Sequence, residues 1–307
     1  MWTDYDVVII GGGPAGLAAG IYTSRAGLRT LLLEKGCIGG EVINRELIEN
    51  YPGFGEGIQG PELASAMAQQ MMSFGAEFEL GEVTGVEVIS NQKIVSTTAN
   101  TYSCQGIIVA SGSLPRKLNV PGEELFAHRG VFYCATCDGP KFAGKEVAVA
   151  GAGDSGITEA LALARIVPKV TVIEFMPKPK ASKILMDRAF ANPKIEIRCA
   201  TKIEQIIGED HVTALALVSC DSGEKSRLPV EGILVRIGLS PNTQFLSNLL
   251  PLTPAGQIPV NESMETAIPG IFAAGDVRQN SPMQIATAVG DGVHAAMSLG
   301  RYVETCR

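Results

Sequence analysis

The chain lacks an excess of basic residues. Its 307 residues include 25 Lys and Arg against 32 Asp and Glu, which gives a formal net charge of −7. Proteins that bind nucleic acid through its phosphates usually carry a basic surface. The charge balance therefore argues against a nucleic acid partner, and it is ordinary for a cytoplasmic protein, which is the location we expect.

Long apolar runs are also missing. A membrane-spanning helix needs about 20 consecutive apolar residues, and no segment provides them. The N-terminal stretch MWTDYDVVIIGGGPAGLAAG is apolar, but it has no basic leading region and glycines interrupt it. We therefore expect neither a membrane span nor an export signal.

The seven cysteines do not form the framework of a small secreted protein, because their number is odd and only one pair is closely spaced. That pair is Cys134 and Cys137 in YCATCDG, residues 133–139, with Asp138 directly after it. Such a pair can ligate a metal, form a structural clip or carry electrons. We expect no redox role for the remaining five, which are Cys37, Cys104, Cys199, Cys220 and Cys306.

An internal repeat organises the chain. Residues 4–34 and 146–174 each predict a strand, a glycine turn, a helix and a second strand that ends in an acid. Both copies carry the spacing G-x-G-x-x-G, and every matched position is offset by 140 residues. The first copy has Gly11, Gly13, Gly16 and Glu34, and the second has Gly151, Gly153, Gly156 and Glu174.

The chemistry of dinucleotide binding explains this spacing. The first glycine permits a tight turn, the second lets the backbone approach a pyrophosphate, and the third lets helix and strand pack closely. The acid at the end of the second strand accepts hydrogen bonds from a ribose diol. Two such motifs in register predict that the protein binds two dinucleotides.

The remaining elements predict a discontinuous first domain. Residues 267–277, AIPGIFAAGDV, indicate a short strand that ends in Gly275-Asp276, and an apolar-periodic helix follows from about Gln284 to Leu299. We assign residues 1–113 and 244–307 to one domain and residues 114–243 to another. The predicted class is α/β, with two Rossmann-like three-layer dinucleotide-binding domains, the second inserted into the first. The crossings SGSLP at 111–115 and GLSPN at 238–242 look like hinges.

These motifs resemble those of the low-molecular-weight thioredoxin reductases over nearly the whole chain. The matching stretches are GGGPAG at 11–16, ENYPGF at 49–54, CATCDG at 134–139, GAGDSG at 151–156 and GIFAAGDV at 270–277. The resemblance implies FAD on the first glycine motif, a nicotinamide nucleotide on the second, and a redox-active disulfide between Cys134 and Cys137. It also implies thioredoxin or a thioredoxin-like protein as partner, and a homodimer.

Electron transfer is also favoured when the cysteine pair is weighed without the family. Zinc needs about four ligands, yet there is no second cysteine pair and the three histidines show no ligand spacing, so we expect no metal. A structural disulfide is unusual in a reducing cytosol. By resemblance, Cys137 faces the flavin, Cys134 attacks the partner, and Asp138 is the general acid or base for the thiol protons.

The resemblance assigns the other site residues one by one. Those expected to contact FAD are Gly11, Gly13, Pro14, Ala15, Gly16, Glu34, Glu41, Asn50, Gly112, Gly275, Asp276, Gln284, Ile285 and Ala286. Those expected to contact the nicotinamide nucleotide are Gly151, Gly153, Asp154, Ser155, Gly156, Glu174 and Lys180. One departure is Glu41 in GGEV, where these reductases usually carry Gln.

A larger departure concerns the electron donor. NADPH-dependent members follow the second strand of the repeat with His-Arg-Arg and a later Arg, which grip the 2′-phosphate. Here Glu174, Phe175 and Met176 occupy those places, with Lys180 at the later one. Because Glu174 would repel a 2′-phosphate and bind an unphosphorylated ribose, we predict NADH as donor and NADPH as the weaker alternative.

Other functions share some of these sequence features. A reductase of this type can take electrons from ferredoxin, but the intact GAGDSG with its registered Glu174 favours a nicotinamide. A flavin dithiol oxidase also uses FAD and C-x-x-C, whereas Asp138 and the second nucleotide motif favour a reductase. A nucleotide-binding redox sensor would need an output module, and nothing in the chain resembles one.

Overall fold

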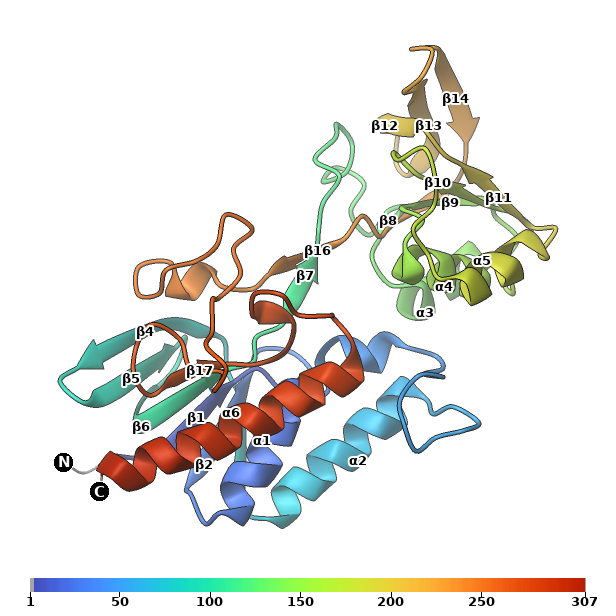
Figure 1. Ribbon diagram of the computed structural model, residues 1–307. Helices are drawn as coiled ribbons and strands as arrows, with labels where there is room; N and C mark the ends of the chain where they lie inside the picture. The colour runs from blue at the N-terminus through green and yellow to red at the C-terminus, as the bar shows by residue number, and fades with distance from the viewer. Residues whose placement is uncertain (1–2, 307) are drawn as a thin grey trace. The chain divides into compact units, whose positions relative to one another are not determined.

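A computed structural model describes residues 3–306, without the side chains of Cys137 and Cys306 (Figure 1). The chain forms two compact units, Met1–Leu114 with Ser240–Arg307, and Pro115–Leu239. Leu114 and residues 240–243, which we had assigned to the inserted domain, belong to the first unit.

The first unit is built on a seven-stranded sheet within the described residues, in the order β3-β2-β1-β6-β5-β4, with β17 also paired to β6. Strands β1, β2, β3, β6 and β17 pair in parallel, whereas β5 pairs antiparallel with both β6 and β4. The bounds are β1 (Tyr5–Ile10), β2 (Thr30–Glu34), β3 (Glu77–Leu80), β4 (Val83–Ile89), β5 (Gln92–Thr97), β6 (Thr101–Val109) and β17 (Ile271–Ala273).

Three helices cover one face of this sheet, α1 (Pro14–Arg25), α2 (Gly60–Ser73) and α6 (Ile285–Cys306) (Figure 1). Successive residues of a strand point to opposite faces, so Val7 and Ile9 pack under the helices while Val8 and Ile10 pack with the β4–β5 hairpin and the segment after residue 244. The apolar period of α6 continues beyond Leu299, where we expected the helix to end. Short turns of helix lie at η1 (Gly40–Asn44), η3 (Gln244–Leu246) and η4 (Gly275–Val277).

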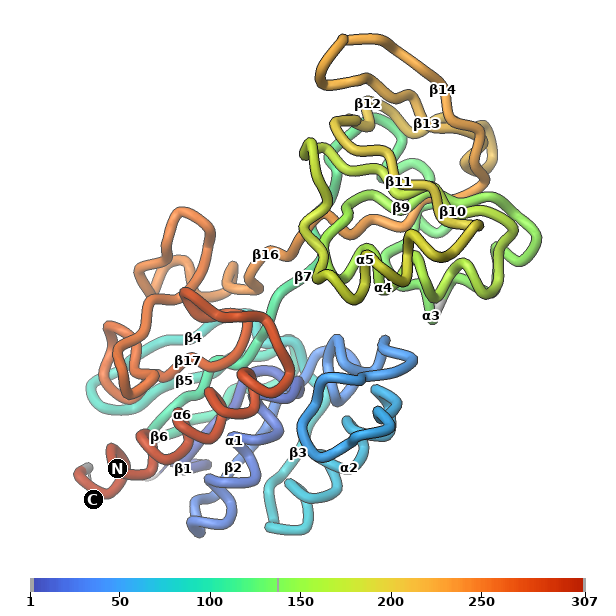
Figure 2. Tube along the Cα trace, turned by 45° about the vertical axis from the view of Figure 1, so that its right-hand side comes forward, coloured from blue at the N-terminus to red at the C-terminus, as the bar shows by residue number. Residues whose placement is uncertain are grey.

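The second unit has a fully parallel five-stranded sheet in the order β11-β10-β9-β15-β8. Its strands are β8 (Val131–Phe132), β9 (Val147–Ala150), β10 (Val170–Ile173), β11 (Ile195–Arg198) and β15 (Gly232–Val235). Helices α3 (Ala135–Asp138), α4 (Asp154–Leu163) and α5 (Lys183–Phe190), with η2 (Gly139–Phe142), lie on one face. The antiparallel sheet β12 (Thr201–Gly208), β13 (Val212–Ser219) and β14 (Lys225–Pro229) covers the other (Figure 2).

The two crossings between the units are strands, β7 (Ser113–Pro115) and β16 (Leu239–Pro241), and they pair with one another in a two-stranded sheet. Their role as hinges stays a prediction. None of the helices in the described part of the chain combines the length and the apolar character that a membrane crossing requires.

Candidate active site and dinucleotide turns

The first glycine turn joins β1 to α1. Gly11 has φ +110°, and a Cβ there would lie 2.3 Å from the carbonyl oxygen of Ala110, so only glycine fits. A Cβ on Gly16 would lie 1.9 Å from the carbonyl oxygen of Gly11, which is the close helix packing that the motif requires. Among the described residues, no atom outside the immediately adjoining chain lies within 4 Å of the Cβ position of Gly13. The turn therefore leaves open space over its second glycine, as a pyrophosphate would need.

Glu34 fastens this turn to the end of β2. Its Oε2 accepts the N–H of Gly12 at 2.8 Å, and its Oε1 accepts the N–H of Gly36 at 2.8 Å. Each carboxylate oxygen has two lone pairs, so both oxygens retain accepting capacity for hydroxyl groups. Pro14 and Ala15 continue into α1, with Pro14 in its first turn, where the missing N–H costs nothing.

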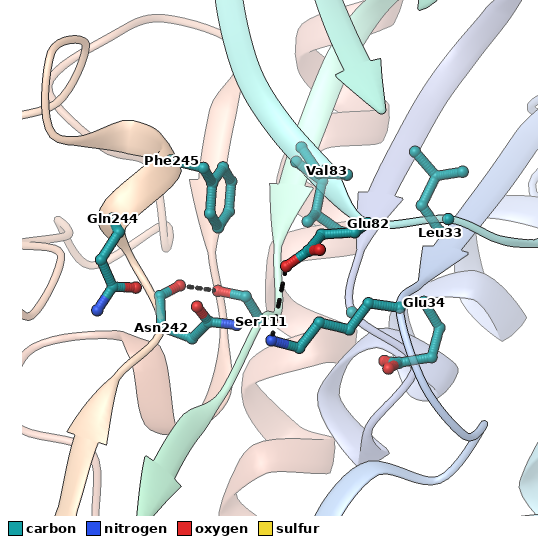
Figure 3. A pocket seen from close by; sticks show the side chains of 12 residues that line it. Leu33, Glu34, Glu82, Val83, Ser111, Asn242, Gln244 and Phe245 are labelled. Atoms are coloured by element: carbon teal, nitrogen blue, oxygen red, sulfur yellow. Dashed lines mark hydrogen bonds and ion pairs between the residues drawn. The ribbon is translucent and has the colours of Figure 1, made fainter. Parts of the chain in front are cut away.

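A pocket of about 190 Å³ lies beside Glu34 (Figure 3). Lys35, Ser111, Asn242 and Phe245 also line it, and the Ser111 hydroxyl donates to the carbonyl oxygen of Asn242 at 2.7 Å. The sequence analysis did not assign these four residues to a binding site, although Ser111 and Asn242 lie in the predicted hinges. They come from three segments far apart in the chain, which meet only in the folded unit.

The other residues expected at the flavin lie in the same unit. Asn50 Nδ2 donates to Gln284 Oε1 at 3.1 Å, so two residues 234 positions apart are brought together, just before α6 begins at Ile285. Ala286 is exposed in the first turn of that helix. Glu41 is exposed on η1. Gly112 has φ +63° at the end of the loop that follows β6.

Gly275 and Asp276 lie in η4. An ion pair between Arg278 and Asp291, which the sequence did not predict, stabilises this turn. Asp291 on α6 accepts the N–H of Gly275 at 3.2 Å, and Arg278 donates to both of its oxygens at 2.6 and 2.9 Å. Burial, with a smaller contribution from the charge of Asp291, raises the pKa of the Asp276 carboxyl above its ordinary value. The turn thus presents a half-buried carboxyl on a rigid support.

The second glycine turn, between β9 and α4, repeats the first in its geometry. Gly151 has φ +103°, and its Cβ would lie 2.2 Å from the carbonyl oxygen of Arg236. A Cβ on Gly156 would lie 2.0 Å from the carbonyl oxygen of Gly151, and the Cβ position of Gly153 is again open. Asp154 and Ser155 follow, both exposed, at the start of α4.

Glu174 fastens the second turn as Glu34 fastens the first. Its Oε2 accepts the N–H of Ala152 at 2.7 Å, and its Oε1 accepts the N–H of Met176 at 2.9 Å. Ala152 and Met176 are the residues 140 positions after Gly12 and Gly36, so the repeat extends to hydrogen bonds that the motif does not specify. Lys180 is exposed on the same loop, and its N–H donates to the carbonyl oxygen of Ala152 at 3.0 Å.

The C-x-x-C segment begins at Cys134, just after β8, and its last three residues lie in α3. Cys134 is half-buried and takes part in a disulfide. The side chain of Cys137 lies outside the described residues, so its pairing with Cys134 stays a prediction. Asp138 Oδ1 forms an ion pair with Lys141 Nζ at 2.7 Å. Among the cysteines whose side chains are described, the free thiols are Cys37, Cys104, Cys199 and Cys220.

Comparison with known proteins agrees with this arrangement. The pattern of the pyridine nucleotide-disulphide oxidoreductase family matches residues 5–292. A thioredoxin reductase of Listeria monocytogenes is 44% identical, covering 98% of this chain and 94% of that protein. One of Bacillus subtilis is 43% identical, covering 98% and 95%. The crystal structure of Lactococcus lactis thioredoxin reductase matches with a TM-score of 0.96 at 42% identity, covering 98% and 100%.

The chain therefore belongs to the pyridine nucleotide-disulphide oxidoreductase family. Within that family it is a flavoprotein disulfide reductase of the thioredoxin reductase type, with the low-molecular-weight fold. The predicted family and the predicted α/β class with two Rossmann-like domains are confirmed. Membership implies FAD and a nicotinamide nucleotide as cofactors.

Proposed function

We propose that the protein takes electrons from NADH and passes them through FAD and a Cys134–Cys137 disulfide to thioredoxin or a thioredoxin-like protein. The observation that carries the proposal is the second turn, whose Glu174 is fastened to Ala152 as Glu34 is to Gly12, in the unit that also holds the disulfide-bonded Cys134. Its relatives named thioredoxin reductases support the choice of partner.

The first unit fits FAD. The open space over Gly13 would receive the pyrophosphate, Glu34 the ribose next to the pocket, and Asp276 the ribityl or phosphate groups. Asn50 and Gln284, which already contact one another, would border the flavin ring. When bound, FAD would supply the two-electron carrier between nicotinamide and disulfide.

The second unit fits NADH better than NADPH. A carboxylate at the end of β10 accepts hydrogen bonds from both hydroxyls of an unphosphorylated ribose, whereas a 2′-phosphate would bring a second anion against it. Phe175 and Met176 are exposed beside Glu174 and carry no charge that could compensate. Lys178 and Lys180, both exposed on the same loop, leave some tolerance for NADPH.

Thiol chemistry defines the last step. In the dithiol form, the Cys134 sulfur attacks a disulfide sulfur of the partner, and the displaced sulfur leaves as a thiol after taking up a proton. Cys137 then attacks Cys134 in the mixed disulfide and releases the second thiol, so the pair loses two electrons and two protons and the partner gains both. Asp138 would move the protons, and its ion pair with exposed Lys141 is of the weak surface type.

We also propose that the protein works in the cytoplasm as a homodimer. The four free thiols among the described cysteines suit a reducing compartment, and the resemblance to these reductases suggests the dimer. Size-exclusion chromatography with light scattering measures the oligomeric state directly, and a monomer at micromolar concentration would contradict the proposal.

The deciding experiment is anaerobic stopped-flow reduction of the bound flavin by NADH, NADPH or reduced ferredoxin, followed by steady-state turnover with a thioredoxin. Fast loss of flavin absorbance with NADH and much slower loss with NADPH is expected. Reduction by ferredoxin alone would overturn the nicotinamide assignment. Oxygen consumption with small dithiols, without turnover of any thioredoxin, would identify a dithiol oxidase instead.

A further inference from the structure

A buried ion pair in the second unit has no place in the function described so far. Arg236 Nη2 donates to Glu159 Oε1 at 3.0 Å, and the two side chains are only 3% and 4% exposed. The partners are 77 residues apart, with Glu159 on α4 and Arg236 directly after β15.

Each partner of this pair also holds a functional segment. The second oxygen of Glu159 accepts the N–H of Ala135 at 2.8 Å, and Ala135 is the residue bonded directly to Cys134. The backbone N–H of Arg236 donates to the carbonyl oxygen of Ala150 at 2.8 Å. The carbonyl oxygen of Arg236 would lie 2.2 Å from a Cβ on Gly151, so that position must be glycine. One ion pair thus joins the cysteine turn to the first glycine of the second dinucleotide turn.

Stability alone does not explain the pair. Burying two charges costs desolvation that their attraction often fails to recover, and apolar residues of similar size commonly do as well. In addition, Arg236 Nε is buried with no acceptor among the described residues, which is a further cost. A pair that is costly in both respects and attached to the cysteine turn points to a role in the chemistry of that turn.

We propose that Glu159 and Arg236 are positioning residues that set the reduction potential of the Cys134–Cys137 pair. The inference rests on the proposed function, because it takes that pair as the redox couple. Reduction breaks the S–S bond, and two electrons from the reduced flavin with one proton give a thiol and a thiolate, which a second proton from solvent converts to the dithiol. The new negative charge arises next to Ala135, where Glu159 disfavours it and Arg236 favours it.

Removing either charge alone should therefore shift the reduction potential of the Cys134–Cys137 pair, and the two removals should shift it in opposite directions. Glu159→Gln keeps an oxygen for the Ala135 N–H and leaves Arg236 unbalanced, which favours the dithiol. Arg236→Met leaves the carboxylate unbalanced, which favours the disulfide. A neighbouring charge commonly shifts the pKa of an ionising group by about one unit or more, so we expect each single variant to change this equilibrium by about tenfold, which for a two-electron couple is about 30 mV.

The test equilibrates each FAD-loaded variant anaerobically with dithiothreitol redox buffers and counts reduced cysteines by alkylation and mass spectrometry. We expect Glu159→Gln to shift the exchange constant about tenfold toward dithiol and Arg236→Met about tenfold toward disulfide. The double variant removes both charges at once, so it should return to within about twofold of the parent value. The exchange constant of Arg236→Lys, which keeps the charge, should also stay close to the parent value. This variant is measured in place of Arg236→Met if Arg236→Met does not fold.

Glu196→Gln is the matched control, because it makes the same charge change in the same unit on β11, the edge strand opposite β8. It should not move the exchange constant. Shifts of both single variants in the same direction, or of less than about twofold, would overturn the inference. If the Cys134–Cys137 pair of the unaltered protein does not exchange electrons with its flavin, the proposed function itself is wrong. That result is seen in the parent protein alone, so it is distinguishable from a failure of this inference, which is seen only in the variants.

Discussion

The proposed preference for NADH should reside largely in Glu174, and Glu174→Gln is the sharpest way to test it. The carboxylate accepts two backbone N–H groups, at 2.7 and 2.9 Å, and keeps lone pairs for a ribose. A glutamine has one accepting oxygen, so an accepting site for a ribose hydroxyl is lost. A hydrogen bond to a charged group contributes about 1.5–3 kcal/mol, so kcat/KM for NADH should fall by about 10- to 150-fold.

NADPH should respond differently to the same change. Two unit charges about 4 Å apart in water repel by about 1 kcal/mol, and more where the site is partly buried. Removing the carboxylate relieves this repulsion, which offsets part of the lost hydrogen bonding. The ratio of kcat/KM for NADH to that for NADPH should therefore fall by about tenfold or more.

Flavin reduction by each nucleotide, measured under single-turnover conditions, gives the two values directly. The matched control is Glu34→Gln, which makes the same change in the first turn and should weaken FAD retention while leaving the nucleotide ratio unchanged once FAD is restored. An unchanged ratio in Glu174→Gln, or a parent protein that already prefers NADPH, would refute the reasoning.

Three further predictions concern the first unit. Gly13→Ala should leave the unfolding free energy of the FAD-free protein within about 1 kcal/mol, because its φ of −74° suits any residue and its Cβ meets nothing. It should nevertheless lower FAD affinity by at least about tenfold, measured by fluorescence titration, since the methyl group occupies the pyrophosphate space. Gly16→Ala should instead destabilise the fold by about 1–3 kcal/mol in urea, because its Cβ would lie 1.9 Å from the Gly11 carbonyl oxygen; a stable Gly16→Ala variant would contradict the packing described. Asp276→Asn should stabilise the FAD-free protein at neutral pH yet weaken FAD binding. Burial raises the pKa of this carboxyl above 3.8, so the folded chain holds the proton more tightly than the unfolded chain does, and ionisation penalises folding as the pH rises. The gain should vanish below pH 3.8, where both states are protonated, and a gain independent of pH in urea unfolding would exclude this cause.

The sequence was sufficient for the features that local spacing determines. Three glycines and an acid lie within one strand–turn–helix–strand unit, so their contacts follow from the motif itself. The two predicted turns accordingly agree in detail, including the open Cβ positions of Gly13 and Gly153. The three layers also follow from local pattern, because β9 and the last four residues of β1 (7–10) are continuous apolar runs that must be covered on both faces.

Features that depend on distant partners could not be predicted in this way. Glu159 in an apolar helix and Arg236 at the end of an apolar strand are each visible as anomalies, but nothing in the sequence pairs them across 77 residues. The same holds for Asp291, whose contacts with Gly275 and Arg278 depend on how α6 returns to β17. The pocket beside Glu34 needs segments from near residues 35, 111 and 244 at once.

The double attachment of Glu174 limits how this protein's choice of nucleotide could be redesigned or could evolve. The side chain expected to select the ribose is also the acceptor that holds Ala152 and Met176 in the turn. An arginine, the residue suited to a 2′-phosphate, has no acceptor atoms. A single replacement would therefore leave two backbone donors to find new partners, so a change of coenzyme would require rebuilding the loop between β10 and α5 as a whole.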